Sequence, residues 1–252
     1  DLAPTLADVM PSKGNAQVTI PMHAIEVTEG IFDLGFAIDP ASGQIVQGYA
    51  IVKYKENYAK NNIRGKPSSG STCYAFLASG TKWKNKEDYS VYPENDKGLD
   101  HTTIKSIIVK NINNWESAAE NANIFGSDVA GTVSNLGLDG ENEVFFADVA
   151  SIGAIAVTEV WGVFSGPPSN RKLVEWNMVF DDFDFNWSVE EEGVAGKMDL
   201  DNIGNHEMGH AFGMGHPSDT CTEETMFRFA TEGEIKKRTL NAGDIAGISK
   251  LY

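Results

Sequence analysis

The stretch HEMGHAFGMGH, residues 206–216, constrains this chain more than any other feature of its sequence. It contains three of the five histidines, His206, His210 and His216. Residues four apart lie on the same face of an α-helix, so His206 and His210 can bind one ion from a single helix. Zinc prefers imidazole nitrogens at about 2.0–2.1 Å in a tetrahedral array, and a catalytic site leaves one position for water. The spacing therefore predicts a helix that carries part of a metal site.

The residues after the second histidine explain how a third ligand reaches the same ion. Gly213 can adopt a left-handed conformation that ends the helix, and the chain can then fold back so that His216 approaches from another direction. Glu207 follows the first histidine and is placed to take a proton from water at the open position. A lone His-x-x-x-His pair is often a surface feature, whereas the full pattern is far more specific. We therefore expect one catalytic Zn²⁺, held by three histidines, with Glu207 as general base.

The chain is predicted to divide at residues 60–72, which are rich in Asn, Gly, Pro and Ser. Residues 17–54 before this linker contain alternating and apolar runs separated by a turn, a pattern typical of β-strands. We expect a small β-rich N-terminal segment, residues 1–72, and a catalytic domain, residues 73–252. The N-terminal segment is either an inhibitory pro-segment or a permanent accessory module, and the sequence leaves both open.

Strand and helix patterns alternate along the second part. Apolar residues at helical spacing predict a long helix within 102–125 behind a threonine cap. The histidine helix should begin near Asp199 or Asp201, and a last helix should occupy about 241–252. Strands are expected at about 82–95, 138–149, 153–164 and 171–183. This order is typical of an α/β or α+β layered domain.

The charge and the first residue bear on partners and location. The chain has 36 acidic and 20 basic residues, a formal net charge of −16, which argues against binding to nucleic acid or to an anionic membrane surface. No run approaches the roughly 18 apolar residues of a membrane span. The chain begins at Asp1 rather than methionine, which suggests removal of an upstream segment. We expect a secreted monomer.

The long histidine motif is the signature of metzincin zinc endopeptidases, and residues 73–252 resemble a matrixin catalytic domain. Met226 in CTEETMF matches the methionine turn of that group, and TLNAGDIAGISKLY resembles the closing matrixin helix. The resemblance implies a twisted, mixed five-stranded sheet with an antiparallel edge strand, two long helices and a C-terminal helix. It also implies that Met226 forms an apolar floor beneath the metal and is not a ligand.

Some positions depart from the matrixin pattern. Pro217 follows the third histidine where matrixins usually have serine or threonine, and Arg228 stands where serralysins and astacins place a zinc-reaching tyrosine. Only His23 and His101 lie outside the motif, too few for the structural three-histidine zinc site of vertebrate-type matrixins. Calcium could stabilise the fold instead, because acidic loops offer hard oxygen ligands, although such loops are also common on acidic proteins. The candidate calcium ligands are Asp139, Asp181, Asp182 and Asp184.

Cys73 and Cys221 are the only cysteines, and three interpretations are open. We favour a disulfide that ties the start of the catalytic domain to the loop before the methionine turn, which would imply an oxidising compartment. The second is the matrixin cysteine switch, although its usual proline-arginine-cysteine-glycine sequence is replaced here by STCYAF. The third is a pair of unrelated buried thiols.

These features predict a secreted, zinc-dependent endopeptidase that acts on a protein or peptide. The substrate would lie extended along the edge strand, expected at about 154–161, and pair through its backbone. Residues 227–240 would form the wall of the pocket for the side chain after the cut, which we expect to be apolar. Two alternatives remain. One is a latent or blocked zinc-containing binding or surface module, with a side chain from residues 1–73 on the metal. The other is a processing protease of narrow specificity.

Overall fold

The computed structural model describes residues 17–56, 58, 72–120, 122–131 and 136–252, and its centre is one mixed sheet. The sheet has the order β1-β2-β3-β8-β9-β7-β5-β6, and β13 also pairs with β3. The strands are β1 Ile25–Thr28, β2 Ile31–Ile38, β3 Ile45–Lys55, β4 Ala75–Phe76, β5 Glu87–Val91, β6 Phe125–Asp128, β7 Glu143–Ala147, β8 Ala154–Val163, β9 Lys172–Asp181, β10 Trp187–Ser188, β11 Met198–Asp199, β12 Met214–Gly215 and β13 Phe229–Ala230. The helices are α1 His101–Ala118, α2 Leu200–Ala211 and α3 Ala242–Leu251, with short 3₁₀ helices at Pro168–Asn170 and Lys236–Arg238.

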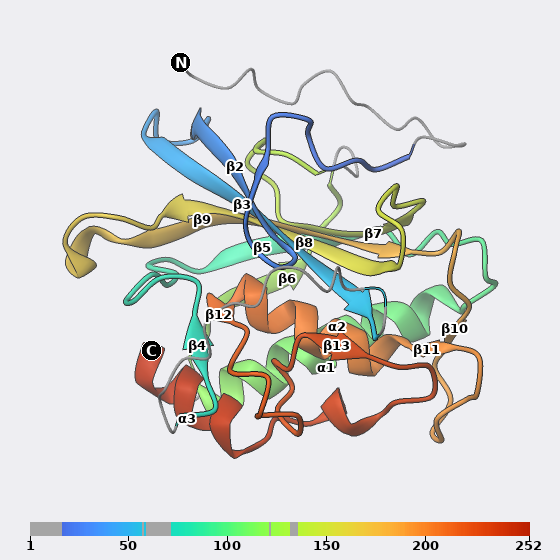
Figure 1. The fold of residues 1–252 in the computed structure, drawn as a ribbon. Helices are drawn as coiled ribbons and strands as arrows, with labels where there is room; N and C mark the ends of the chain where they lie inside the picture. The colour runs from blue at the N-terminus through green and yellow to red at the C-terminus, as the bar shows by residue number, and fades with distance from the viewer. Residues whose placement is uncertain (1–16, 57, 59–71, 121, 132–135) are drawn as a thin grey trace.

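The helices α1, α2 and α3 lie together on one face of the sheet (Figure 1). Their apolar side chains and those of the sheet face above them form one large core, which includes Trp115, Trp176 and Phe212. A mixed sheet with several helices fits the expected α+β class. No helix in the described part of the chain is both long enough and apolar enough to span a bilayer.

Helix α1 begins and ends at different residues from those expected from the sequence. It is capped by Asp100, whose side chain accepts hydrogen bonds from the backbone and the hydroxyl of Thr103, so the cap is an aspartate and not a threonine. The helix ends at Ala118, and Phe125, the last residue of the 102–125 stretch, begins β6 instead. Asp100 was missed because threonine and aspartate are both good caps and stand close together here.

The sheet corrects the expectation of five strands with an antiparallel strand at the edge. Among the described residues it has nine strands, because β1, β2, β3 and β13 extend it. Strand β3 pairs antiparallel with β8 from Gln47 opposite Gly162 to Tyr54 opposite Ala154, so β8 is not an edge. An edge strand leaves a row of unpaired backbone donors and acceptors. Strand β3 makes hydrogen bonds with these backbone groups of β8, although no local sequence signal predicts that the two strands pair.

A second core lies on the sheet face opposite the helices. It combines side chains from the N-terminal strands, such as Leu34 and Val52, with side chains from β7, β8 and β9, such as Phe145, Val157 and Val179. Residues before and after the expected boundary therefore share one core. The linker expected at 60–72 lies outside the described residues except for Thr72, and the division into two domains stays a prediction.

Candidate metal centre

Helix α2 places two histidines side by side. It begins after Asp199, whose carboxylate accepts a hydrogen bond from the Asn202 backbone N–H at 2.8 Å, and all of its residues are buried. The chain turns away at Gly213, which has a φ of +99°. A side chain at this glycine would meet the carbonyl oxygen of Thr81, so both the backbone conformation and the packing require glycine. The turn brings His216 back towards the helix.

The three histidines of the motif converge through their Nε2 atoms. Nε2 of His216 lies 3.1 Å from Nε2 of His210 and 3.3 Å from Nε2 of His206. Nδ1 of His206 lies 2.6 Å from the carbonyl oxygen of Thr225, and Nδ1 of His210 lies 2.9 Å from that of Met214. A carbonyl oxygen can only accept, so these Nδ1 atoms carry the hydrogens and the Nε2 lone pairs face one another.

This arrangement fits a tetrahedral cation. Ligands at about 2.0–2.1 Å in a tetrahedral array lie about 3.3–3.4 Å apart, close to the separations of the Nε2 atoms. Among the described residues, these histidines form the group of three ligand atoms that lie within 4.8 Å of one another. Backbone carbonyls that accept from Nδ1 also fix the ring orientation, as is common for histidines that bind a metal.

Burial keeps the histidines neutral. It lowers the pKa of His210 to about 3 and the pKa values of His206 and His216 well below their usual value. The neighbouring histidines lower the pKa of His206 and His216 further. A neutral imidazole is the form that binds a metal.

Glu207 lies beside this cluster with one oxygen held and one free to act. Its Oε2 accepts a hydrogen bond from the Thr158 hydroxyl at 2.7 Å, and its Oε1 lies 3.9 Å from Nε2 of His206. Oε1 is buried and has no hydrogen-bond partner among the described residues. Burial raises the pKa of Glu207 to about 7, while the Thr158 hydrogen bond and the charge of Lys53 lower it. A proton acceptor next to the three Nε2 atoms is suited to general-base chemistry.

Met226 lies in a tight turn that is fixed from α3. The side chain is fully buried, and a side chain on Gly209 of α2 would collide with its sulfur, so Met226 packs directly against the helix that carries the histidines. Its backbone N–H and that of Thr225 donate to the Asp244 carboxylate at 3.1 and 2.7 Å. Asp244 also completes the capping box of α3 by accepting from the backbone N–H of the N-cap residue Asn241, and it therefore couples the closing helix to the turn.

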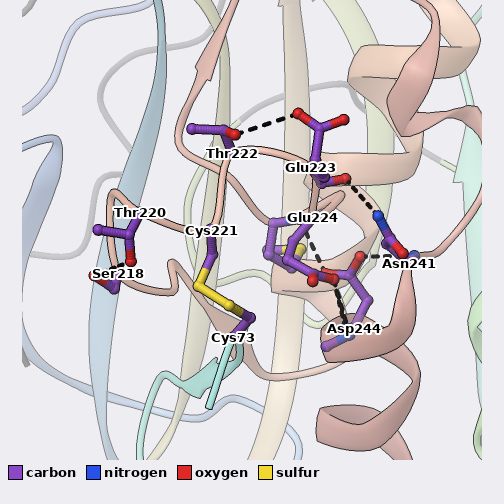
Figure 2. The surroundings of a disulfide bond; sticks show 11 residues. Cys73, Ser218, Thr220, Cys221, Thr222, Glu223, Glu224, Asn241 and Asp244 are labelled. Atoms are coloured by element: carbon purple, nitrogen blue, oxygen red, sulfur yellow. Dashed lines mark hydrogen bonds between the residues drawn. A yellow bond between two sulfur atoms is a disulfide. The ribbon is translucent and has the colours of Figure 1, made fainter. Parts of the chain in front are cut away.

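A disulfide holds the loop between the third histidine and Met226. Cys73 and Cys221 are joined at a sequence separation of 148, which is the first of the three interpretations offered above (Figure 2). Next to it, Glu224 accepts hydrogen bonds from the backbone of Gly243 and Asp244 at the start of α3. Both links fix the path of the chain past His216.

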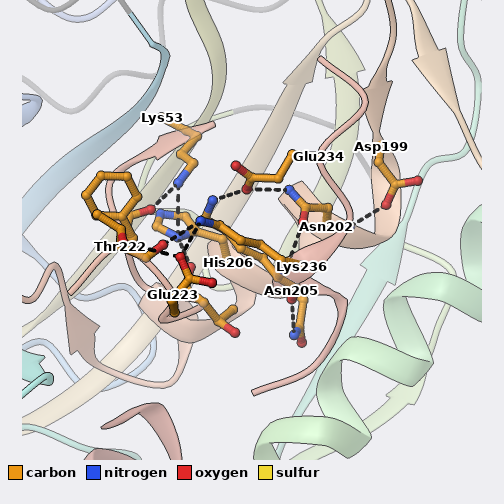
Figure 3. A network of polar contacts seen from close by, with 12 residues as sticks. Lys53, Asp199, Asn202, Asn205, His206, Thr222, Glu223, Glu234 and Lys236 are labelled. Atoms are coloured by element: carbon orange, nitrogen blue, oxygen red, sulfur yellow. Dashed lines mark hydrogen bonds and ion pairs between the residues drawn. The ribbon is translucent and has the colours of Figure 1, made fainter. Parts of the chain in front are cut away.

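Lys53 of β3 and Thr158 of β8 lie near the cluster, and the sequence analysis missed both. Lys53 is fully buried, and its ammonium group donates to the carbonyl oxygen of Phe227 at 2.7 Å. Its Nζ lies 3.2 Å from Nδ1 of His206 (Figure 3). Burial lowers the pKa of Lys53 well below its usual value. The sequence signal for Lys53 was a lysine within the otherwise apolar run of β3, which is unusual for a buried strand. Thr158 gave no such signal, because threonine is common in strands.

Arg228 occupies the position of the absent tyrosine and has partners of its own. It forms ion pairs with Glu29, in the turn between β1 and β2, and with Asp219, at 2.7 Å in the second case. Arg228 and Glu29 line a cavity of about 530 Å³ that also reaches His216. The N-terminal strands therefore lie near the cluster at two places, Lys53 beside His206 and Glu29 in the cavity that reaches His216.

The expected calcium ligands do not gather like the histidines. Asp181 accepts hydrogen bonds from the backbone of Phe183 and Asp184, both at 2.9 Å, and Asp182 accepts one from Asp96. Asp139 donates its backbone N–H to Glu175 at 3.0 Å. The described residues show no group of three acidic ligands as close as the histidine group, and calcium stays a prediction.

The comparison with protein families points to the same part of the chain. The family model described as Matrixin, of the M10 peptidases, matches residues 165–252. This range contains α2 with its histidines, Met226 and α3. Curated proteins offer no match to the sequence. The family match indicates a zinc metallopeptidase.

Proposed function

Because the chain contains a matrixin-like metzincin domain, we propose that it is a secreted endopeptidase that binds one zinc ion through His206, His210 and His216. The observation that carries the proposal is the meeting of three neutral Nε2 atoms beside the unpartnered Oε1 of Glu207. A site that only stabilised the fold would have no use for a buried carboxylate with a free oxygen at this position.

When zinc is bound, it would supply a Lewis acid for the peptide carbonyl and make a nearby water more acidic. Glu207 then takes the proton of the attacking water on Oε1 and passes it to the departing amine. Thr158 holds the other oxygen, so that the carboxylate keeps its orientation. A pKa of about 7 suits a group that must accept a proton and release it near neutral pH.

The disulfide supports the extracellular location, since such bonds persist in oxidising compartments. The alternative of a site blocked by a ligand from residues 1–73 gains no support from Lys53. The ammonium group of Lys53 lies beside Nδ1 of His206, whereas the expected metal position lies on the Nε2 side of that ring.

The test is hydrolysis of unfolded casein with and without a zinc chelator, by the intact chain and by a chain cut between Glu56 and Thr72. We expect cleavage that the chelator stops and added zinc restores. Glu207→Ala should retain one zinc per chain and lose hydrolysis by at least about a thousandfold, since it lacks the base. Glu223→Ala, which changes an exposed carboxylate on the surface, is the matched control. Undiminished hydrolysis by Glu207→Ala would refute the mechanism.

A further inference from the structure

The cavity at His216 lies between the N-terminal strands and the histidine cluster. Its apolar lining comes from both parts of the chain, namely Val27, Ile31, Tyr49, Phe76 and Leu77. His216 is partly exposed, whereas His206 and His210 are fully buried. A polypeptide can therefore reach the expected metal position from the side of His216, through this cavity.

A substrate in this cavity cannot be held by adding a strand to β8. Strand β3 pairs with β8 from Gln47 to Tyr54, and it is also paired with β2 and packed in the core that both parts of the chain share. The N-terminal strands are therefore an integral part of the sheet beside the site. Contacts with the apolar side chains around the cavity have to supply affinity for an extended substrate instead.

The sheet face that lines the cavity continues outwards as an exposed apolar surface. Along β3, Tyr49 shares this face with Gln47 and Ile45, because side chains alternate along a strand. Residues that lie opposite each other in paired strands also share a face, so Phe36, opposite Gln47, and Ile38, opposite Ile45, belong to it. The exposed members, which we call the apolar face, are Ile25, Val27, Phe36, Ile38 and Ile45, with exposed fractions of 48% to 68%.

Two residues of β1 connect the apolar face to the cavity. Ile25 is opposite Asp33, which is itself opposite Tyr49 of the cavity. Val27 lines the cavity and is 54% exposed, so it belongs to both. The helices lie away from the end of the β2–β3 hairpin and leave the apolar face uncovered there (Figure 1). An exposed apolar patch that is continuous with a cavity is typical of an interaction surface.

The length and charge of this surface suit one kind of partner. Strand β2 runs from Ile31, in the cavity, to Ile38, in the apolar face, a distance of about 23 Å at about 3.3 Å per residue. An extended segment of about seven residues therefore fits along it. Among the described residues that line the cavity, the carboxylates of Glu29 and Asp219 stand against the guanidinium of Arg228. This excess of negative charge disfavours an acidic segment.

We propose that the apolar face and the cavity at His216 together bind the substrate, and that they take an extended, neutral or basic polypeptide segment rich in large apolar side chains. The N-terminal strands thereby select the substrate. This inference rests on the proposed function, because it names the substrate class of the same site. The continuity of the apolar face with the cavity, through Val27, assigns this face to the substrate and not to a second copy of the chain.

The first experiment uses the full, zinc-loaded chain and quenched fluorescent peptides that share one cleavable sequence. One peptide is extended by seven residues of leucine and phenylalanine spaced by glutamine, and its matched control by seven residues of serine and glycine. Each extension is placed before the cut and, separately, after it. We expect kcat/KM to be at least tenfold higher for the apolar extension on one side, through a lower KM. Equal values on both sides would overturn the proposal.

The second experiment locates the selectivity in the apolar face. The ratio of kcat/KM between the apolar and the serine-glycine peptides should fall at least threefold in Phe36→Ser and in Ile25→Ser. Phe183→Ser is the matched control, because Phe183 is 68% exposed and follows β9, outside the apolar face. It should keep the wild-type ratio. A folded, zinc-loaded double variant of Phe36 and Ile25 with the wild-type ratio would overturn the proposal.

A binding measurement separates this proposal from the proposed function. The labelled peptides are titrated against the full Glu207→Ala chain, which lacks the base. The apolar peptide should bind at least tenfold more tightly than the serine-glycine peptide, and Phe36→Ser should reduce this difference. If it does so while the wild-type chain cleaves no peptide, the proposed function fails and the binding surface stands. If the peptides are cleaved with equal kcat/KM, the proposed function stands and this inference fails.

The same chains show whether a second copy covers the apolar face. Sedimentation of the wild-type chain should give a monomer at the concentrations of the assay. A dimer that Phe36→Ser dissociates, together with equal binding of the two peptides, would assign the apolar face to self-association and overturn the proposal.

Discussion

Replacement of Thr158 by valine tests what sets the pKa of Glu207, the proposed general base. The Thr158 hydroxyl donates to Oε2 of Glu207 at 2.7 Å, and both side chains are fully buried. Valine has nearly the same shape as threonine and lacks the donor. Burial raises the pKa of Glu207 to about 7 against the opposing effect of this hydrogen bond. Loss of the donor should therefore raise the pKa further.

The size of the effect follows from the hydrogen bond. A hydrogen bond to a charged group contributes about 1.5–3 kcal/mol, and one pKa unit corresponds to about 1.4 kcal/mol. The pKa of Glu207 should therefore rise by about one to two units in Thr158→Val. The base acts as a carboxylate, so hydrolysis is present above its pKa and is lost as the pH falls through it. At pH 6 the variant should be about 10–100-fold slower than wild type, and the difference should vanish well above pH 9.

The assay is the pH profile of kcat/KM for a fluorescent peptide, measured on a form of the chain that cleaves it. Thr158→Ser keeps the hydroxyl and is the matched control, with an expected profile close to that of wild type. Zinc content is measured in parallel, so that loss of metal is not mistaken for a shift in pKa. A Thr158→Val profile that coincides with wild type, or that moves to lower pH, would show that this hydrogen bond does not set the pKa of the base.

Other parts of the structure give three more expectations. Removal of the Cys73–Cys221 bond by a double alanine substitution should destabilise the protein by about 5 kcal/mol in the chain-entropy model, given a separation of 148 residues. A thermal scan should then show a Tm lower by about 10 °C; free thiols in the untreated protein would contradict the bond. His216→Ala should lose most of its zinc on dialysis, and metal analysis that finds full occupancy would refute its role as third ligand. Burial raises the pKa of Glu159 from 4.5 to about 7, so stability should fall by about 3 kcal/mol as the pH rises from about 4.5 to 7 and should level off above that. Glu159→Gln, which still accepts from Trp161, should remove this dependence in urea unfolding at pH 5 and pH 8; an unchanged dependence would exclude Glu159 as its source.

The part of the site that could be predicted from the sequence is the part encoded locally. The spacing of His206 and His210 follows from the helical period, and the start of α2 follows from Asp199 as a cap. Gly213 also has a local reason, since only glycine readily takes its backbone conformation. Each of these features depends on residues within a few positions in the chain, so a single sequence is enough to expect them.

The pairing of β3 with β8 depends on contacts between distant residues. Apolar residues in both strands indicate β structure and burial, but they do not say which strand lies beside which. The sequence therefore predicts that β8 is an edge strand, open to an extended substrate. Lys53 was the one local sign that β3 has a polar contact, because an isolated lysine in an apolar strand is rarely buried unless it has a specific partner. That partner, the carbonyl oxygen of Phe227, lies in a loop whose position no local rule gives.

The alternation of side chains along β3 explains how one strand serves two purposes. Ala50 and Val52 point into the core on the face away from the helices, whereas Ile51 packs in the core on the helix side. Lys53 shares the face of Ile51 and therefore reaches the histidine cluster. A slip of one residue would exchange the two faces, bury the ammonium group among apolar side chains and bring an apolar residue to Phe227. The cost of such a burial is high, so the hydrogen bond from Lys53 to Phe227 fixes the register of β3 on β8.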